Sequence, residues 1–78
     1  MSVDDERGVP QAAFREGGDV YIIYSFEDVA FHWEQGTGIV RRRFRGETRE
    51  GQTDHTNRLF NDARMGGRLA TREEYENY

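Results

Sequence analysis

A run of arginines in the middle of the chain contains the residues best suited to bind an anion. Arg41, Arg43 and Arg45 alternate along an expected strand, and alternate residues of a strand share one face. These three guanidinium groups, called the Arg row below, would bind carboxylate or phosphate through paired hydrogen bonds. With Arg49 in the following loop and His32 on the neighbouring strand, the Arg row forms the first candidate binding surface.

Two interpretations of the Arg row remain open. It could follow a nucleic-acid backbone, with nearby aromatic rings stacking on bases. It could also be an ordinary solvated strand face that acidic residues such as Glu34 and Glu47 neutralise. The chain carries 15 acidic and 11 basic side chains, for a formal net charge of −4. Because phosphate-binding domains are usually basic overall, this composition favours the second interpretation.

A second candidate surface combines carboxylates with tyrosines, at an expected turn and in the last helix. Its residues are Glu27, Asp28, Glu73, Glu74, Tyr75 and Tyr78. The carboxylates would suit a basic partner, for instance a nucleic-acid-binding protein, and tyrosine is enriched at protein interfaces. The alternative is that the carboxylates serve solubility and helix ends, while the tyrosines belong to the core.

Groups for catalysis or metal binding are scarce. The sequence has no Cys, and its two histidines are His32 and His55. On a helix Asp54 and His55 would point about 100° apart, so they would not chelate an ion together. Ser25 has no base near it in the sequence, and no glycine-rich phosphate loop is present. We therefore expect no enzyme, no catalytic residue, no metal site and no cofactor.

Length and composition predict one small domain. A chain of 78 residues buries only about 60% of its unfolded surface, so its core must come largely from ten aromatic side chains. A homodimer would also enlarge this core and stays open. We expect a flexible acidic tail over residues 1–11 and a single domain over residues 12–78. Since no signal peptide and no membrane span are recognisable, we expect a cytoplasmic protein with no membrane partner.

Three segments have the pattern of β-strands: residues 20–25, 29–34 and 39–45. A further strand over residues 12–16 stays open. The glycines in residues 35–38 allow a tight turn between the second and third strands. With Glu34 opposite Ile39, the predicted pairs are Trp33 with Val40, His32 with Arg41, Phe31 with Arg42 and Val29 with Phe44. Arg42 would then lie along the aromatic rings, and the Arg row would project from the opposite face.

Two helices are expected after a polar loop over residues 46–52. Thr53 would cap the first, whose apolar positions Leu59, Phe60 and Ala63 recur at helical spacing, and a glycine in the left-handed conformation would end it at residues 65–67. Residues 71–74 read as the capping box of a second, short helix. We therefore predict an α+β fold: a small antiparallel β-meander of three or four strands packed against one C-terminal helix plus a short terminal helix. The first helix would cover Phe31, Trp33 and Phe44.

In size, acidity and lack of catalytic groups, the chain resembles small proteins of mobile elements, including anti-CRISPR inhibitors. This resemblance implies a non-enzymatic binding module that acts by protein–protein contact as an inhibitor or regulator of nucleic-acid machinery. Its partner would be another protein, such as a nucleic-acid-binding protein. The alternative function is direct nucleic-acid binding through the Arg row, and a purely structural or oligomerising subunit is a third.

Overall fold

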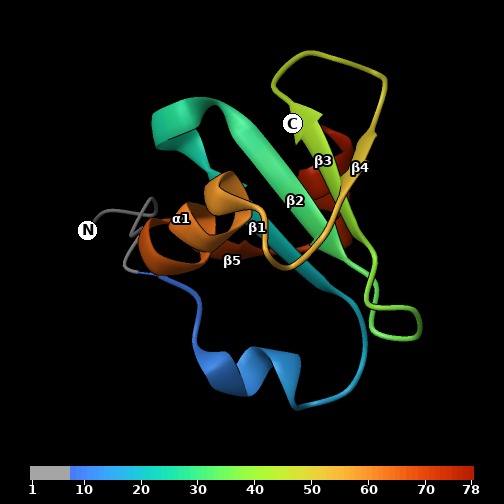
Figure 1. Cartoon of the computed structure of the whole chain (residues 1–78). Helices are drawn as coiled ribbons and strands as arrows, with labels where there is room; N and C mark the ends of the chain where they lie inside the picture. The colour runs from blue at the N-terminus through green and yellow to red at the C-terminus, as the bar shows by residue number, and fades with distance from the viewer. Residues whose placement is uncertain (1–7) are drawn as a thin grey trace.

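The computed structural model describes residues 8–78, which form a five-stranded antiparallel sheet with short helices on both faces (Figure 1). The strands lie in the order β4-β3-β2-β1-β5. They are β1 Val20–Tyr24, β2 Val29–Trp33, β3 Val40–Phe44, β4 Gly51–Thr53 and β5 Arg68–Ala70. The helices are α1 Arg58–Gly66 and α2 Arg72–Glu76, with 3₁₀ turns η1 Gln11–Phe14 and η2 Ser25–Glu27. The α+β class and the antiparallel meander are as predicted.

The central hairpin of β2 and β3 has the predicted register. The Glu34 amide donates to the Ile39 carbonyl at 2.9 Å. The paired residues are Val29 with Phe44, Phe31 with Arg42, His32 with Arg41 and Trp33 with Val40. The guanidinium of Arg42 lies 5.5 Å from the centre of the Phe44 ring, as expected for a cation above an aromatic face.

The main core lies between the sheet and α1. Phe31 and Phe60 are almost fully buried and meet edge to face, with ring centres 5.4 Å apart. The expectation that the helix also covers Phe44 was wrong. Trp33 does pack against the core that includes Phe60 and Ala63, but it is only half-buried there. Phe14 of η1 meets the Trp33 ring at 5.3 Å, because the chain before β1 folds back over this end of the sheet. Phe44 stays 37% exposed at the end of β3.

A second, smaller core lies on the opposite face of the sheet, under α2. Ile23 and Ala30 are buried there against Tyr75, which is only 3% exposed. The central strands β1 and β2 therefore bury side chains on both faces, in agreement with the dense apolar content of residues 20–25. Helix α2 begins with the predicted capping box, in which Thr71 and Glu74 exchange hydrogen bonds.

Several local features differ from the predictions or decide what they left open. Residues 11–14 form a 3₁₀ turn, so the open question of a strand over residues 12–16 is answered by a helical turn. Helix α1 is capped by Asn57 rather than Thr53, and the Asn57 side chain accepts from the Phe60 amide at 3.0 Å. Gly67 after the helix is not left-handed, since its φ is −92°. Two strands of three residues each, β4 and β5, were missed and extend the sheet at both edges.

Most of the expected acidic tail, residues 1–7, falls outside the described residues. Of its remainder, the Gly8 amide donates to the Gly67 carbonyl at 2.8 Å and the Val9 amide to the Arg64 carbonyl at 2.7 Å. Val9 packs against the main core. Within residues 8–78, no helix has the length and apolar character needed to cross a membrane.

Candidate functional site

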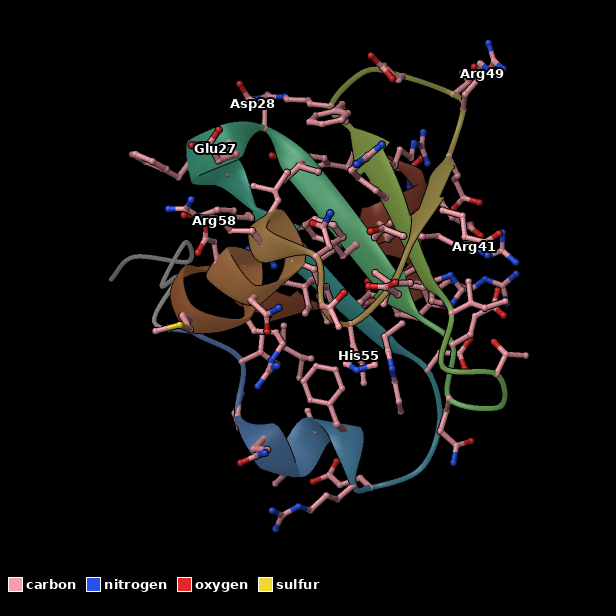
Figure 2. All side chains as sticks on the ribbon, viewed as in Figure 1. Glu27, Asp28, Arg41, Arg49, His55 and Arg58 are labelled. Atoms are coloured by element: carbon pink, nitrogen blue, oxygen red, sulfur yellow. The ribbon has the colours of Figure 1, made fainter. Side chains whose placement is uncertain are left out.

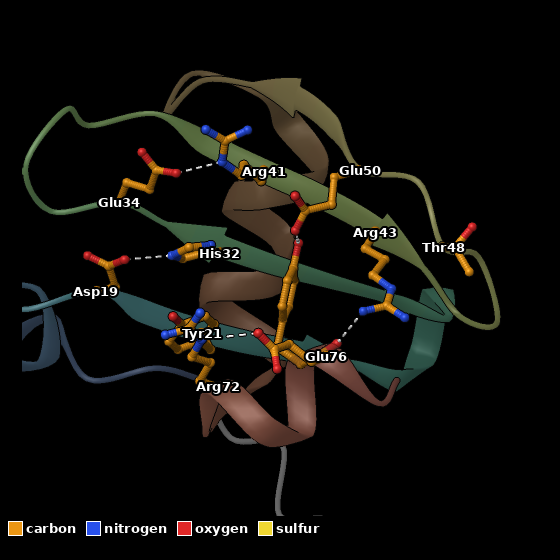
Figure 3. A pocket seen from close by; sticks show the side chains of 11 residues that line it. Asp19, Tyr21, His32, Glu34, Arg41, Arg43, Thr48, Glu50, Arg72 and Glu76 are labelled. Atoms are coloured by element: carbon orange, nitrogen blue, oxygen red, sulfur yellow. Dashed lines mark hydrogen bonds and ion pairs between the residues drawn. The ribbon is translucent and has the colours of Figure 1, made fainter.

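A polar groove of about 450 Å³ lies on the sheet face opposite α1, between the central strands and α2 (Figure 3). Strands β1 to β3, the loop after β3 and helix α2 all contribute side chains to it. The lining residues are Asp19, Tyr21, His32, Glu34, Arg41, Arg43, Thr48, Glu50, Arg72, Tyr75 and Glu76. Charged side chains dominate this list, so the groove can form directed hydrogen bonds to a charged or polar partner.

Tyr75 anchors α2 to the floor of the groove. Its ring lies 5.6 Å from that of Tyr21 and 5.7 Å from that of His32. Its hydroxyl donates to Glu50 Oε2 at 2.6 Å. Burial of the ring, reinforced by the Glu50 carboxylate, raises the pKa of Tyr75 well above its ordinary value. The phenol therefore remains a hydrogen-bond donor.

Two acidic groups beside Tyr75 are fixed by internal hydrogen bonds. Asp19 contacts His32 Nε2 at 2.7 Å and also accepts from the Gln35 amide at 3.1 Å. Glu34 accepts from Arg41 Nε at 2.6 Å and from the Thr37 hydroxyl at 3.0 Å. The hydrogen bond from His32 lowers the pKa of Asp19, and the one from Arg41 lowers the pKa of Glu34.

The Arg row lies on the predicted face, but each of its members has an internal partner. Arg41 pairs with Glu34, as the interpretation of a neutralised strand face predicts. Arg43 donates to the carbonyls of Glu47 and Tyr75 at 2.7 and 3.2 Å. The expectation that this face is open to solvent needs correction, because α2 lies across part of it.

The other predicted residues of this surface are not gathered with Arg41. Arg45 lies 3.7 Å from Asp28 and beneath the Tyr78 ring, 5.8 Å from its centre. Arg49 lies in the loop between β3 and β4, far from Arg41 in Figure 2. His32 does lie in the groove, opposite Arg41 as predicted, but its hydrogen-bond partner is Asp19. The structure thus divides the predicted anion surface between the groove and its surroundings.

The second candidate surface is likewise not one patch. Glu27 and Asp28 lie at the corner between η2 and β2 (Figure 2). Glu74 is engaged in the α2 capping box and with Arg68 at 3.2 Å. Glu73 lies beside Glu74 in the same first turn of α2, where a carboxylate interacts favourably with the helix dipole. Tyr75 is buried, so it contributes to the core rather than to an exposed surface.

The groove residues Thr48, Glu50 and Arg72 were absent from the sequence-based candidates. The position of Asp19 was identifiable in principle, because it precedes β1 and the antiparallel pairing of β1 with β2 brings it toward His32. The positions of Glu50, Arg72 and Glu76 depend on where α2 and the loop before β4 dock, which no local pattern specifies. Within residues 8–78, no cluster of three or more His, Asp or Glu is arranged to hold a metal ion.

Comparison with known proteins gives a consistent result. Residues 8–77 match the family of Tis1 immunity proteins. The immune protein Tis1 of Pseudomonas aeruginosa (strain UCBPP-PA14) is 51% identical over 59 residues, which cover 74% of this chain and 77% of that protein. A chain in the crystal structure of the complex between the type VI effector Tas1 and its immunity protein is similar with a TM-score of 0.78 and 46% identity. That match covers 87% of this chain and 91% of the other. These similarities agree with the expected small protein-binding module and do not single out an anti-CRISPR inhibitor or a nucleic-acid binder.

Proposed function

Since the chain belongs to the Tis1 immunity protein family, we propose that it binds a type VI effector of the Tas1 kind and blocks the effector's action by contact alone. The observation that carries this proposal is the similarity, over most of both chains, to a chain from an effector–immunity complex. We thus retain the inhibitory role that the sequence suggested, but we propose an effector protein as the target in place of nucleic-acid machinery.

The fold suits an inhibitor that works by rigid contact. Both faces of the central strands are packed, and the side chains of the groove are held by hydrogen bonds before any partner arrives. Such preorganisation lowers the entropy lost on binding. The internal pairing of the Arg row argues against a continuous track for a phosphate backbone, so a folded protein is the partner that this surface favours.

Co-expression with Tas1 tests this function. We expect bacteria that produce Tas1 to stop growing and to recover when this chain is produced with it, and we expect the two purified proteins to co-elute in size-exclusion chromatography. Phe60→Ala, which removes a buried ring of the core, provides a control that should lose protection. Growth arrest that persists in the presence of soluble chain, together with separate elution, would contradict the proposal. The cytoplasmic location and the homodimer stay predictions, and the mass of the free chain in solution checks the second.

A further inference from the structure

Carboxylates in the polar groove have little capacity left for a partner. Both oxygens of Asp19 are engaged, with His32 and with the Gln35 amide. Both oxygens of Glu34 accept as well, from Arg41 and Thr37. The remaining two carboxylates of the groove each use one oxygen in an internal hydrogen bond. The groove therefore has few acceptors to offer a basic partner.

Two of the three guanidinium groups of the groove, in contrast, are engaged on one side only, whereas Arg43 donates through both Nε and Nη1. Arg41 donates through Nε to Glu34 at 2.6 Å, and Arg72 donates through Nε to Glu76 at 3.0 Å. Across residues 8–78, no hydrogen bond uses the terminal nitrogens of Arg41 or Arg72. Each Nε contact orients its side chain and leaves free the pair of Nη atoms, one of the edges that grip a carboxylate through two parallel hydrogen bonds.

The groove attracts a charged partner only weakly over long distances. Three guanidinium groups lie among four carboxylates, so the opposite charges nearly cancel. A near-neutral site steers partners weakly, and its selectivity must come from hydrogen bonds formed at contact. An occupant that supplies acceptors in the right geometry fits this description. Asp and Glu side chains are the strongest such acceptors that a protein partner can present.

We infer that the groove is the surface by which the chain holds its effector, and that an acidic segment of the effector binds the free edges of Arg41 and Arg72. The inference rests on the proposed function, because it names the contact chemistry of the same partner. The two arginines come from different elements, β3 and α2, so the segment would bridge the sheet and the helix (Figure 3). The groove volume of about 450 Å³ is enough to receive several side chains.

Calorimetry with purified Tas1 tests the inference by comparing variants of the groove arginines with a control variant that removes the same charge elsewhere. We expect Arg41→Gln and Arg72→Gln each to weaken binding by about tenfold or more, since each removes a bidentate donor. Arg41→Lys should weaken binding nearly as much, because an ammonium group cannot replace the fork. Arg58→Gln is the control: it removes the same charge from α1, on the other side of the sheet (Figure 2), and should change the affinity less than twofold. Thermal melts establish that all four variants remain folded.

A cross-link identifies the chemistry of the partner directly. The natural chain contains no lysine, so Arg41→Lys introduces its only side-chain amine. A carbodiimide activates a carboxylate, and an amine in contact with that carboxylate displaces the activating group to form an amide. We expect Arg41→Lys to couple to an Asp or Glu of Tas1, as mass spectrometry of the digested complex would show. Arg58→Lys, which places its amine on α1, should yield no such product.

The outcomes separate this inference from the proposed function. If wild-type chain does not bind Tas1, the proposed function fails. If wild-type chain binds Tas1 but the groove variants bind equally well and no cross-link forms, the inference alone is overturned. A mobility shift of DNA or RNA that is lost in Arg41→Gln would also overturn it, because the groove would then serve phosphate rather than protein carboxylates.

Discussion

The hydrogen bond from Tyr75 to Glu50 is the contact that ties α2 to the loop before β4. Tyr75→Phe removes the hydroxyl while the buried ring stays in place, so the perturbation is confined to this one interaction. Tyr78→Phe provides a matched control. The Tyr78 hydroxyl is also buried, but it has no hydrogen-bond partner among the described residues.

The magnitude follows from the environment of the two partners. Hydrogen bonds to charged groups contribute about 1.5–3 kcal/mol. Because Glu50 is exposed, water can solvate its carboxylate in the variant, so we expect a loss at or just below the lower end of this range, about 1–1.5 kcal/mol. For a domain of this size each kcal/mol shifts the melting temperature by about 4–8 °C. Tyr78→Phe should leave the melting temperature unchanged or raise it, since it removes an unsatisfied polar atom.

Thermal unfolding followed by the fluorescence of the single Trp measures both effects. A double-mutant cycle of Tyr75→Phe with Glu50→Gln should give a coupling energy of about 1 kcal/mol. The reasoning is refuted if Tyr75→Phe and Tyr78→Phe melt together at the wild-type temperature. A pH series adds a second readout. The folded-state pKa of Tyr75 lies above the ordinary value of 10.0, so the unfolded chain loses this proton first as the pH rises. The free energy of unfolding should therefore fall above that pH. The fall should be smaller in Tyr75→Phe, which lacks the titrating hydroxyl.

Three further predictions concern stability, each measured by urea unfolding. Gly67→Ala should lower the free energy of unfolding by about 1–3 kcal/mol, because an added Cβ would lie 2.6 Å from the Ala63 carbonyl oxygen. The control Gly36→Ala, whose added Cβ meets open space, should be neutral or stabilising. Phe60→Ala should cost about 3–5 kcal/mol, whereas Phe26→Ala, at a side chain 80% exposed, should change stability by less than about 0.5 kcal/mol. The free energy of unfolding should fall as the pH drops below about 4.5, since hydrogen bonds lower the folded-state pKa of four carboxyl groups: Asp19, Glu34, Asp54 and Glu74. Equal stability at pH 7 and pH 3 would contradict this last expectation.

The central hairpin was predictable because its signals are local. Alternating apolar residues define the faces of both strands, and the glycines of the turn fix which residues stand opposite one another. The edge strands β4 and β5 have three residues each, too few for an alternating pattern. Their strand conformation comes from pairing with β3 and β1, which is a tertiary effect that no local window contains.

The start of α1 shows how two good local signals can compete. Thr53 and Asn57 are both residue types that cap helices well. Asp54, however, accepts hydrogen bonds from the amide and hydroxyl of Thr56, and these bonds close a separate turn. The helix therefore begins only after Asn57, which caps it.

The functional groove was only partly predictable for a related reason. The pairing of Arg41 with Glu34 follows from the hairpin, as the interpretation of a neutralised strand face expected. The cover provided by α2 does not follow, because a five-residue helix carries too little pattern to say which face of the sheet it occupies. Tyr75 was therefore assigned to an exposed surface as well as to the core, and only the packing decides between the two.

Nuclear magnetic resonance of the ¹⁵N-labelled chain, titrated with unlabelled Tas1, tests the central claim most directly. We expect the largest signal changes at the amides of Arg41, Arg72 and Tyr75 and at the two arginine side chains, with saturation at one equivalent. Spectra that do not change, or changes confined to α1 on the opposite side of the sheet, would contradict the account.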